Sequence, residues 1–203
     1  MKNFFQGFAT EGAKEMMKDC CSGLGTDQAK EKMKEYCSGF AAENDKDFEV
    51  VKIEKIRNGC TACEDSAEAQ IKKQVPYAII SCEGACLRGE VSRQAANHIC
   101  FSKMPDKTAR ICLGGAFTKD SGQRNLVRNA AKVYVLEGCN TRCASRMMKG
   151  VEEGLHPEVI IVDGLYDFDR KLFGINEVTE QQIKDFSQEA ANKIVEKIKL
   201  DAN

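Results

Sequence analysis

The stretch VYVLEGCNTRCAS, residues 133–145, contains the pattern on which the fold of this chain depends. A short apolar run ends at Glu137, Gly138 follows, and two cysteines stand four positions apart at Cys139 and Cys143. The segment that begins at the second cysteine, CASRMMKGVEE, is rich in residues that favour helices. The stretch therefore predicts a strand, a cysteine-bearing turn and a helix in direct succession.

Four apolar runs of this kind alternate with helical segments in the second half of the chain. They are VPYAIISC (75–82), TARICLGG (108–115), KVYVLEGC (132–139) and PEVIIVDG (157–164), and an amphipathic helix is predicted after them over 179–200. Such alternation is typical of βαβ units with a parallel sheet covered on both faces. We therefore expect an α/β fold: a small, mostly parallel sheet of about four strands in a Rossmann-like three-layer arrangement.

The N-terminal region has a different organisation. AKEMMKDCCSG (13–23) and AKEKMKEYCSG (29–39) match at eight of eleven positions, and both read as short helices that end at Ser-Gly. We predict a cysteine-containing helical hairpin over 1–45. A strand, FEVVKIEKI (48–56), and a helix that opens with Cys-x2-Cys are predicted within 46–75, and the α/β region follows over 76–203.

Cysteines lie at or near the ends of three of the four predicted strands. They are Cys82, Cys112 and Cys139, separated by 30 and 27 residues. Because the ends of parallel strands share one edge of the sheet and neighbouring strands are about 4.8 Å apart, these side chains can converge. Cys86 and Cys143 each follow a strand-end cysteine by four residues and can reach the same edge.

Four convergent thiols suit a tetrahedral zinc ion, which binds sulfur at about 2.3 Å. A closed site of four thiolates would be structural, whereas three thiolates and an open position would allow catalysis. The alternative is that these cysteines are small buried hydrophobic residues. Four of them on one predicted edge favour the metal interpretation.

Composition narrows the class of protein. A net charge of −1 with 30% charged residues gives no basic bias for nucleic acid, and no apolar run approaches the roughly 18 to 20 residues of a membrane span. The first residues lack the apolar core of a secretory signal, so a cytoplasmic location is expected. Since thiols stay reduced there, the 11 cysteines point to metal or redox chemistry rather than disulfides.

The motifs SCEGA (81–85), ICLGG (111–115) and LEGCNTRCA (136–144) together resemble the DGC-domain family, named after an Asp-Gly-Cys motif. VDGLYDF (162–168) is similar to that family's last element, and the resemblance covers roughly residues 76 to 174. It implies a zinc-binding protein in which segment 76–203 is a DGC-like α/β domain with a C-terminal helix.

The resemblance also implies a set of zinc ligands: Cys82, Cys112, Cys139 and Cys143. Two positions depart from the family pattern. Glu137 replaces the aspartate of the motif, and Cys86 stands where a small polar residue is more usual. Cys86 is thereby a fifth candidate ligand, an exchange ligand or a resolving thiol.

Cys60-Thr-Ala-Cys63 has a spacing that suits a zinc knuckle or a redox pair. Because the Trp and Pro that usually surround redox pairs are missing, metal is favoured. With Cys21 and Cys37 from the repeat, the pair would complete a second four-sulfur zinc site that staples the small hairpin. Otherwise these are thiols on amphipathic helices.

Three functions remain open, and no catalytic residue is assigned. A structural or metal-handling zinc protein is favoured, since the chain shows no Ser-His-Asp set and no paired acid and base. The alternatives are a thiol-dependent redox or sulfur-handling enzyme that uses Cys86 or Cys143, and an iron–sulfur carrier or sensor held by four cysteines. The expected partner is a metal ion, with neither nucleic acid nor membrane involved.

Overall fold

A computed structural model describes residues 51–54 and 59–201 of the chain. Nearly all of these residues belong to the second of two compact units, Ile53–Asn203. The hairpin predicted over 1–45, with Cys21 and Cys37, lies outside the described residues. Residues 51–54 are exposed and belong to no strand, so in this part of 48–56 the predicted strand is wrong. Among the described residues, neither Val51 nor Ile53 is part of a buried apolar cluster.

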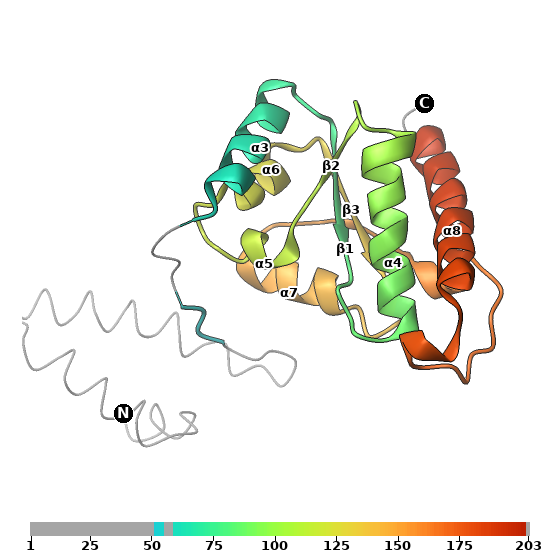
Figure 1. Cartoon of the computed structure of the whole chain (residues 1–203). Coiled ribbons are helices and arrows are strands. Elements are labelled where there is room, and N and C mark those ends of the chain that lie inside the picture. Colours follow the sequence, from blue (N-terminus) through green and yellow to red (C-terminus); the bar gives the residue numbers. More distant parts are fainter. Residues whose placement is uncertain (1–50, 55–58, 202–203) are drawn as a thin grey trace, which may run out of the picture. The chain divides into compact units, whose positions relative to one another are not determined.

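The four predicted strands of the α/β region are present and form one sheet. They are β1 (Tyr77–Ser81), β2 (Thr108–Arg110), β3 (Lys132–Glu137) and β4 (Glu158–Ile161). Their order is β2-β1-β3-β4 and every pairing is parallel (Figure 1). The predicted α/β fold with a four-stranded parallel sheet is confirmed.

The helices of the described part have the following bounds. The α-helices are α3 (Thr61–Lys72), α4 (Leu87–His98), α5 (Leu113–Ala116), α6 (Gly122–Asn129), α7 (Cys143–Val151) and α8 (Glu180–Asp201). A π-helical turn, Ile99–Lys103, extends α4, and 3-10 turns lie at Val162–Gly164 and Ile175–Glu177.

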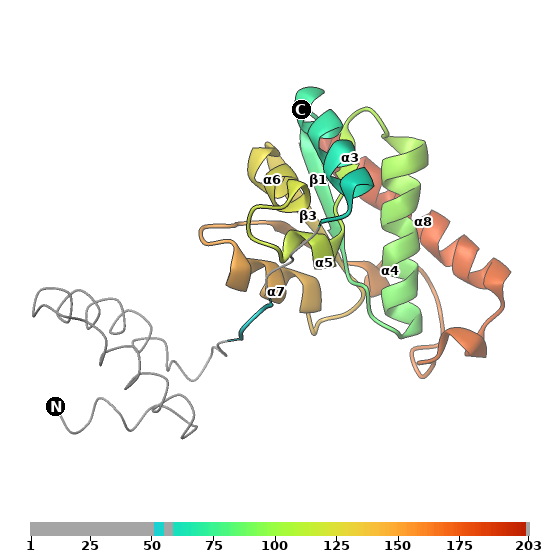
Figure 2. The same ribbon diagram turned by 60° about the vertical axis from the view of Figure 1, so that its left-hand side comes forward.

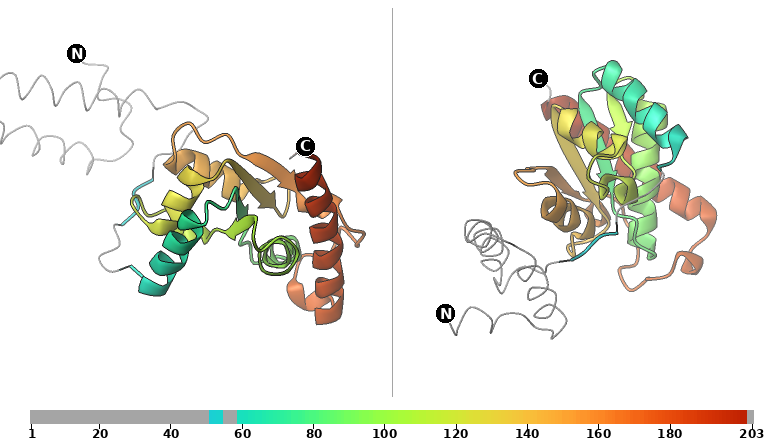
Figure 3. Two further views of the ribbon diagram at one scale, coloured as in Figure 1. Left: turned by 90° about the horizontal axis from the view of Figure 1, so that it is seen from above. Right: turned by 90° about the vertical axis from the view of Figure 1, so that its left-hand side faces the viewer.

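Helices cover both faces of the sheet, which gives the predicted three layers. One face packs against α4 and α8, whereas α3, α5, α6 and α7 cover the other, as Figure 2 and the view from above in Figure 3 show. Successive residues of a strand enter different cores. In β1, Ile79 faces α4 and α8 and Ile80 faces the other helices; in β3, Tyr134 and Val135 do the same. This burial on both sides explains why the strands are continuous apolar runs rather than alternating ones.

The strand order places a topological switch point between β1 and β3. The chain leaves β1 for β2 on one side and returns past β1 to β3 on the other, so the connecting helices α4 and α6 cover opposite faces. In open α/β sheets, ligands bind beyond the carboxyl ends of the strands at such a switch point. Here Ser81 pairs with Leu136, and the Cys82 amide donates to the Leu136 carbonyl at 2.8 Å. Cys82 therefore lies at the switch point.

None of the helices within the described residues is both long and apolar enough to cross a membrane.

Candidate metal centre

The three strand-end cysteines lie on neighbouring strands at one edge of the sheet. Cys112 follows β2, Cys82 follows β1 directly, and Cys139 follows β3 after one glycine. Because β1 is flanked by β2 and β3, Cys82 is central, with Cys112 on one side and Cys139 on the other. The edge is the one predicted from the spacing.

Cys82 and Cys86 lie close together around Gly84. A Cβ added at Gly84 would be 3.3 Å from the sulfur of Cys82 and 3.8 Å from the sulfur of Cys86. Both sulfurs therefore border the same small space, which the missing side chain of Gly84 leaves open. Cys86 precedes α4 as its N-cap residue, so the fifth candidate thiol joins the strand-end group.

Cys82 is the buried member of this group, with 7% of its surface exposed. Burial raises the pKa of its thiol, which the backbone amides of Gly84 and Gly138 partly counteract, and the negative charges of Glu137 and Cys143 add to the rise. Because the charge of Cys143 acts on the Cys82 thiol, the two side chains lie near each other. Cys82 is therefore a protonated thiol at neutral pH unless a cation or another positive group replaces its proton.

The Cys139–Cys143 segment is a tight turn that leads into α7. The Arg142 amide donates to the Cys139 carbonyl at 3.2 Å, and Arg142 has a left-handed backbone with φ of 55°. The Cys139 thiol donates to the Thr141 hydroxyl at 3.4 Å. Cys143 is the first residue of α7 and is exposed, as the predicted C-x3-C turn requires.

Glu137 binds backbone amides at the start of α7, the helix that begins with Cys143. Its side chain is fully buried, and its carboxylate accepts the amides of Ser145 at 2.6 Å and Ala144 at 3.3 Å. Helix N-termini leave such amides without partners, and a carboxylate also interacts favourably with the helix dipole. The side chain thus sets the position of the helix that begins with Cys143.

Three glycines allow the backbones at this edge to approach one another closely. A Cβ at Gly89 would lie 2.7 Å from the Cα of Gly84, and a Cβ at Gly138 would lie 2.8 Å from the carbonyl oxygen of Arg88. No side chain fits at either place. The first turn of α4 is therefore packed directly on the turns that carry Cys82 and Cys139.

Gly89→Ala is expected to destabilise the protein by about 2–3 kcal/mol, because the new methyl group meets backbone rather than a movable side chain. A glycine-to-alanine change inside a helix normally stabilises by about 0.5–1 kcal/mol, so the sign is reversed here. Gly150→Ala in α7 is the matched control, since nothing lies within 4 Å of its Cβ position. Urea unfolding of both variants measures the difference; equal stabilisation by both changes would contradict the close approach of α4.

Cys112, the strand-end cysteine after β2, is also near Cys63 of the Cys60–Cys63 pair. Its amide donates to the side-chain oxygen of Gln123 at 2.8 Å, its sulfur accepts the Gly115 amide at 3.5 Å, and its thiol is exposed. The negative charge of Cys112 is also close enough to raise the pKa of Cys63. Sequence reasoning missed this neighbour, because α3 is placed beside α6 only by tertiary packing.

The remaining cysteines have distinct positions. Cys60 and Cys63 are exposed at the start of α3, whereas their predicted partners Cys21 and Cys37 lie outside the described residues. The second four-sulfur site therefore stays a prediction. Cys100 is a core residue of the π-helical turn, and burial raises its pKa to about 11.

Charged side chains border the cysteines on both sides. Arg110 pairs with Glu83 at 2.5 Å and donates to the Ser81 hydroxyl between the ends of β1 and β2. Beyond β4, the carboxylate of Asp163 contacts Arg88 at 3.5 Å and Arg170 at 3.6 Å. Glu83 and Asp163 are each paired with arginine, so Asp163 acts here as an ion-pair partner.

Tyr166 is a buried polar residue near the Asp163 cluster, with 5% of its surface exposed. Its hydroxyl has no hydrogen-bond partner among the described residues. Burial raises its pKa, and the charges of Asp163 and Cys86 contribute to the rise. The residue is thus a neutral phenol in the vicinity of the Cys86 thiol.

The cysteine side chains at this edge are not arranged as a metal coordination sphere. Within residues 51–54 and 59–201, no three Cys, His, Asp or Glu groups are arranged so that they could hold a metal ion. The cysteines fit zinc in donor type and in their position at neighbouring strand ends. Binding would require the exposed thiols of Cys112 and Cys143 to turn toward buried Cys82.

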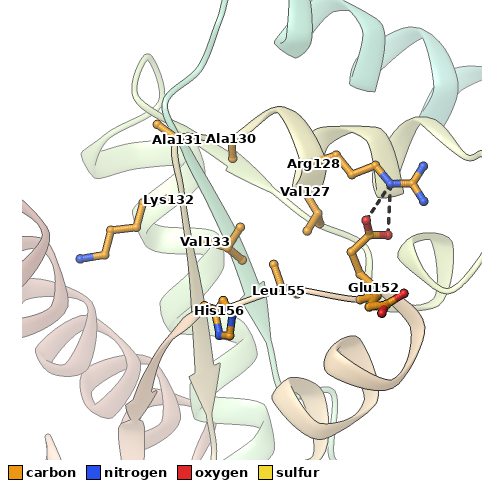
Figure 4. Close-up of a pocket in the computed structure, with 11 residues that line it drawn as sticks. Val127, Arg128, Ala130, Ala131, Lys132, Val133, Glu152, Leu155 and His156 are labelled. Atoms are coloured by element: carbon orange, nitrogen blue, oxygen red, sulfur yellow. Dashed lines mark hydrogen bonds and ion pairs between the residues drawn. The ribbon is translucent and has the colours of Figure 1, made fainter.

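A hollow of about 330 Å³ lies at the opposite edge of the sheet, where β3 and β4 begin (Figure 4). Glu152 and Arg128 line it as an ion pair at 2.9 Å, and exposed His156 borders it. No cysteine contributes to its wall. The hollow is therefore separate from the cysteine edge, and His156 is no neighbour of the thiols.

The chain is thus an α/β protein whose parallel sheet has helices on both faces and cysteines at the carboxyl ends of three neighbouring strands. The chain belongs to the DGC domain family: the family model matches residues 78–198, which is more than half of the chain. The match confirms the resemblance seen in the motifs and extends it from the predicted end near residue 174 into α8. Comparisons with curated proteins and with solved structures give no match.

Proposed function

We propose that this protein binds one zinc ion through cysteine thiolates at the carboxyl edge of its sheet, in a structural or metal-handling role. The observation that carries the proposal is the strand order, which puts Cys112, Cys82 and Cys139 on three neighbouring strands. Cys143 at the start of α7 supplies the fourth thiol. Membership of the DGC domain family supports the same interpretation.

The proposed ligands are Cys82, Cys112, Cys139 and Cys143, with Cys86 as the alternative to Cys112. Two features favour Cys86 as the exchange ligand: its sulfur shares the space at Gly84 with Cys82, and Cys112 is also near Cys63. Zinc accepts four sulfur ligands in tetrahedral geometry, and such closed sites are structural. Nearby backbone amides of Gly84 and Gly138 would offset part of the negative charge of the thiolates.

Elemental analysis of anaerobically purified full-length protein tests this proposal. We expect about one zinc per chain at this site and a loss of about 10-fold or more in zinc affinity in Cys82→Ser and Cys139→Ser. Cys100→Ala is the control, because Cys100 is buried in the core away from the edge and should leave zinc content unchanged.

Comparison of Cys112→Ser with Cys86→Ser decides which of these two thiols completes the site. Zinc-free protein from zinc-replete cells would contradict the proposal, as would full zinc retention in both Cys82→Ser and Cys139→Ser. Iron and acid-labile sulfide in place of zinc would also contradict it, and visible absorption of the anaerobic preparation reveals that case.

A further inference from the structure

Backbone pairing holds the end of β1 to β3 further along the strand than it holds it to β2. Pairs between β1 and β3 continue to Ser81, and the Cys82 amide then donates to the Leu136 carbonyl at 2.8 Å. Pairs between β1 and β2 end two residues earlier, at Ile79 with Arg110. The sheet therefore fixes Cys82 against β3, whereas the position of Cys82 relative to the end of β2 depends on other contacts.

The guanidinium of Arg110, the last residue of β2, reaches across to the end of β1. It donates to the Ser81 hydroxyl at 2.6 Å and pairs with the Glu83 carboxylate at 2.5 Å. The Ser81 hydroxyl donates in turn to the same oxygen of Glu83 at 3.0 Å. Because Ser81 and Glu83 are the two neighbours of Cys82 in the chain, this network holds the backbone on both sides of that cysteine.

The same guanidinium also binds the end of its own strand and α4. It donates to the carbonyl of Ile111, the residue before Cys112, and to the side-chain oxygen of Asn97 on α4 at 3.2 Å. Its side chain is 12% exposed. A guanidinium presents its donors in a rigid planar fork, so several acceptors bound at once define where it lies. One side chain thus joins the segment that carries Cys82 to the segment that carries Cys112.

The contribution of this network is one of position more than of charge. The carboxylate of Glu83 lies directly against the guanidinium of Arg110 and offsets its positive charge. Thiolates at the sheet edge would therefore gain little from the net charge of the pair. What the pair provides is a fixed arrangement of two strand ends that the backbone ladder leaves unpaired.

We propose that Arg110 is a positioning residue that holds the end of β2, and with it Cys112, in place beside the Cys82 segment. For its zinc part the inference rests on the proposed function, where it makes Cys112 the preferred fourth ligand. Cys86 stays near Cys82 around Gly84, a turn that β2 does not form. Loss of the Arg110 fork should therefore favour Cys86 over Cys112 as the ligand.

Amide hydrogen exchange of the metal-free, full-length protein tests the tie between the strand ends without any zinc. The Ile111 amide, which donates to the Ile79 carbonyl at 2.9 Å, reports opening on the β2 side, and the Cys82 amide reports the β3 side. In Arg110→Met we expect exchange at Ile111 to be about 10-fold faster and exchange at Cys82 to be unchanged. NMR spectroscopy resolves the two amides.

Arg110→Lys keeps the positive charge but lacks the fork, so it should show the same local opening. It also answers the question if Arg110→Met does not fold. Arg128→Met is the matched control, because Arg128 pairs with Glu152 at the hollow on the opposite edge of the sheet. That variant removes the same charge and should leave exchange at Ile111 and Cys82 unchanged.

Alkylation of the zinc-loaded protein tests the choice of ligand. Iodoacetamide and mass spectrometry map the thiols that the ion protects. In both Arg110 variants we expect Cys112 to react about 10-fold faster than in the unmodified protein, Cys86 to react more slowly, and zinc affinity to fall about 10-fold. Cys82 and Cys139 should remain protected, whereas a general loss of stability would expose all of these thiols together.

Three outcomes would overturn the inference: unchanged exchange at Ile111 in both Arg110 variants, equal acceleration at Ile111 and Cys82, and undiminished protection of Cys112 by zinc. A separate result bears on the proposed function alone. If zinc protects none of the cysteines in the unmodified protein, the zinc site fails, while the exchange measurement still decides whether Arg110 holds the strand ends together.

Discussion

Removal of zinc by a strong chelator should lower the melting temperature of the full-length protein by about 10 °C or more. A ligand that binds only the folded state at a thousandfold excess over its Kd stabilises that state by about 4 kcal/mol, and one kcal/mol shifts melting by about 2–4 °C in a chain of this size. The strand-end thiols come from segments far apart in sequence, so a bound ion would hold β1, β2, β3 and α7 together.

The metal-free protein should nevertheless keep its fold. Two extensive apolar clusters, one on each face of the sheet, are complete without the cysteine edge. The expected loss is therefore a fraction of the roughly 10–16 kcal/mol by which zinc drives the folding of small zinc fingers. Differential scanning fluorimetry before and after chelation measures the shift, and circular dichroism at 20 °C checks that secondary structure is retained.

Two controls test whether the change in melting temperature is due to zinc at this site: addition of metal to the chelated protein, and the Cys82→Ser variant. Zinc should restore the melting temperature and magnesium should not, since thiolates are poor ligands for magnesium. Cys82→Ser should melt near the chelated protein and respond little to chelator. An unchanged melting temperature after complete removal of zinc would show that the metal has no structural role at this edge.

Glu137→Ala should destabilise the protein by about 3–6 kcal/mol. The change removes the acceptor for the Ser145 and Ala144 amides at the start of α7 and leaves both buried without partners. Loss of hydrogen bonds to a charged group costs about 1.5–3 kcal/mol each, and the empty volume of a fully buried side chain adds to this. Urea unfolding monitored by circular dichroism measures the loss.

Glu137→Gln separates charge from shape. The amide side chain keeps one carbonyl acceptor but turns a donor toward the second amide, so about half of the loss is expected. Glu153→Ala is the control, because Glu153 is exposed and such surface changes stay within about 0.5 kcal/mol. Wild-type stability in Glu137→Ala would mean that the buried carboxylate does not cap α7.

The carboxylate is also expected to tune zinc binding, since it positions the helix that begins with Cys143. Loss of a group that orients metal ligands typically lowers affinity about 10- to 100-fold. Competition with a chromophoric chelator measures this for Glu137→Gln, which retains more of the fold. Unchanged zinc affinity would show that Cys143 reaches the metal without help from α7.

Local patterns predicted the succession of elements in the α/β region. Val75–Cys82 and Lys132–Cys139 are apolar runs that end at a cysteine, and each is followed by residues that favour helices, so strand and helix could be assigned without tertiary information. The same patterns predicted that Cys82, Cys112 and Cys139 stand near strand ends. The same reasoning predicted a strand that includes residues 51–54, which these residues do not form, because β propensity depends strongly on the surroundings of a segment.

The edge itself was assembled by contacts that no local pattern encodes. Gly84 and Gly89 belong to one short stretch, but only packing of α4 against the ends of β1 and β3 shows that Gly138 has to approach the same helix. The cap that Glu137 forms on α7 likewise depends on the turn at Arg142, whose left-handed backbone reverses the chain. The sequence showed that Glu137 replaces the aspartate of a family motif, but it did not show that its side chain caps α7.

What the sequence determined by itself is the order of strands and helices along the chain and the cysteines placed at their ends, because apolar periodicity and helix propensity act over a few neighbouring residues. Only the tertiary structure decided the strand order β2-β1-β3-β4, the sharing of one space by Cys82 and Cys86, and the approach of Cys63 to Cys112. Those features depend on which distant segments of the chain bury their apolar faces against each other. That pairing is set by the packing of the whole core and not by any local stretch of sequence.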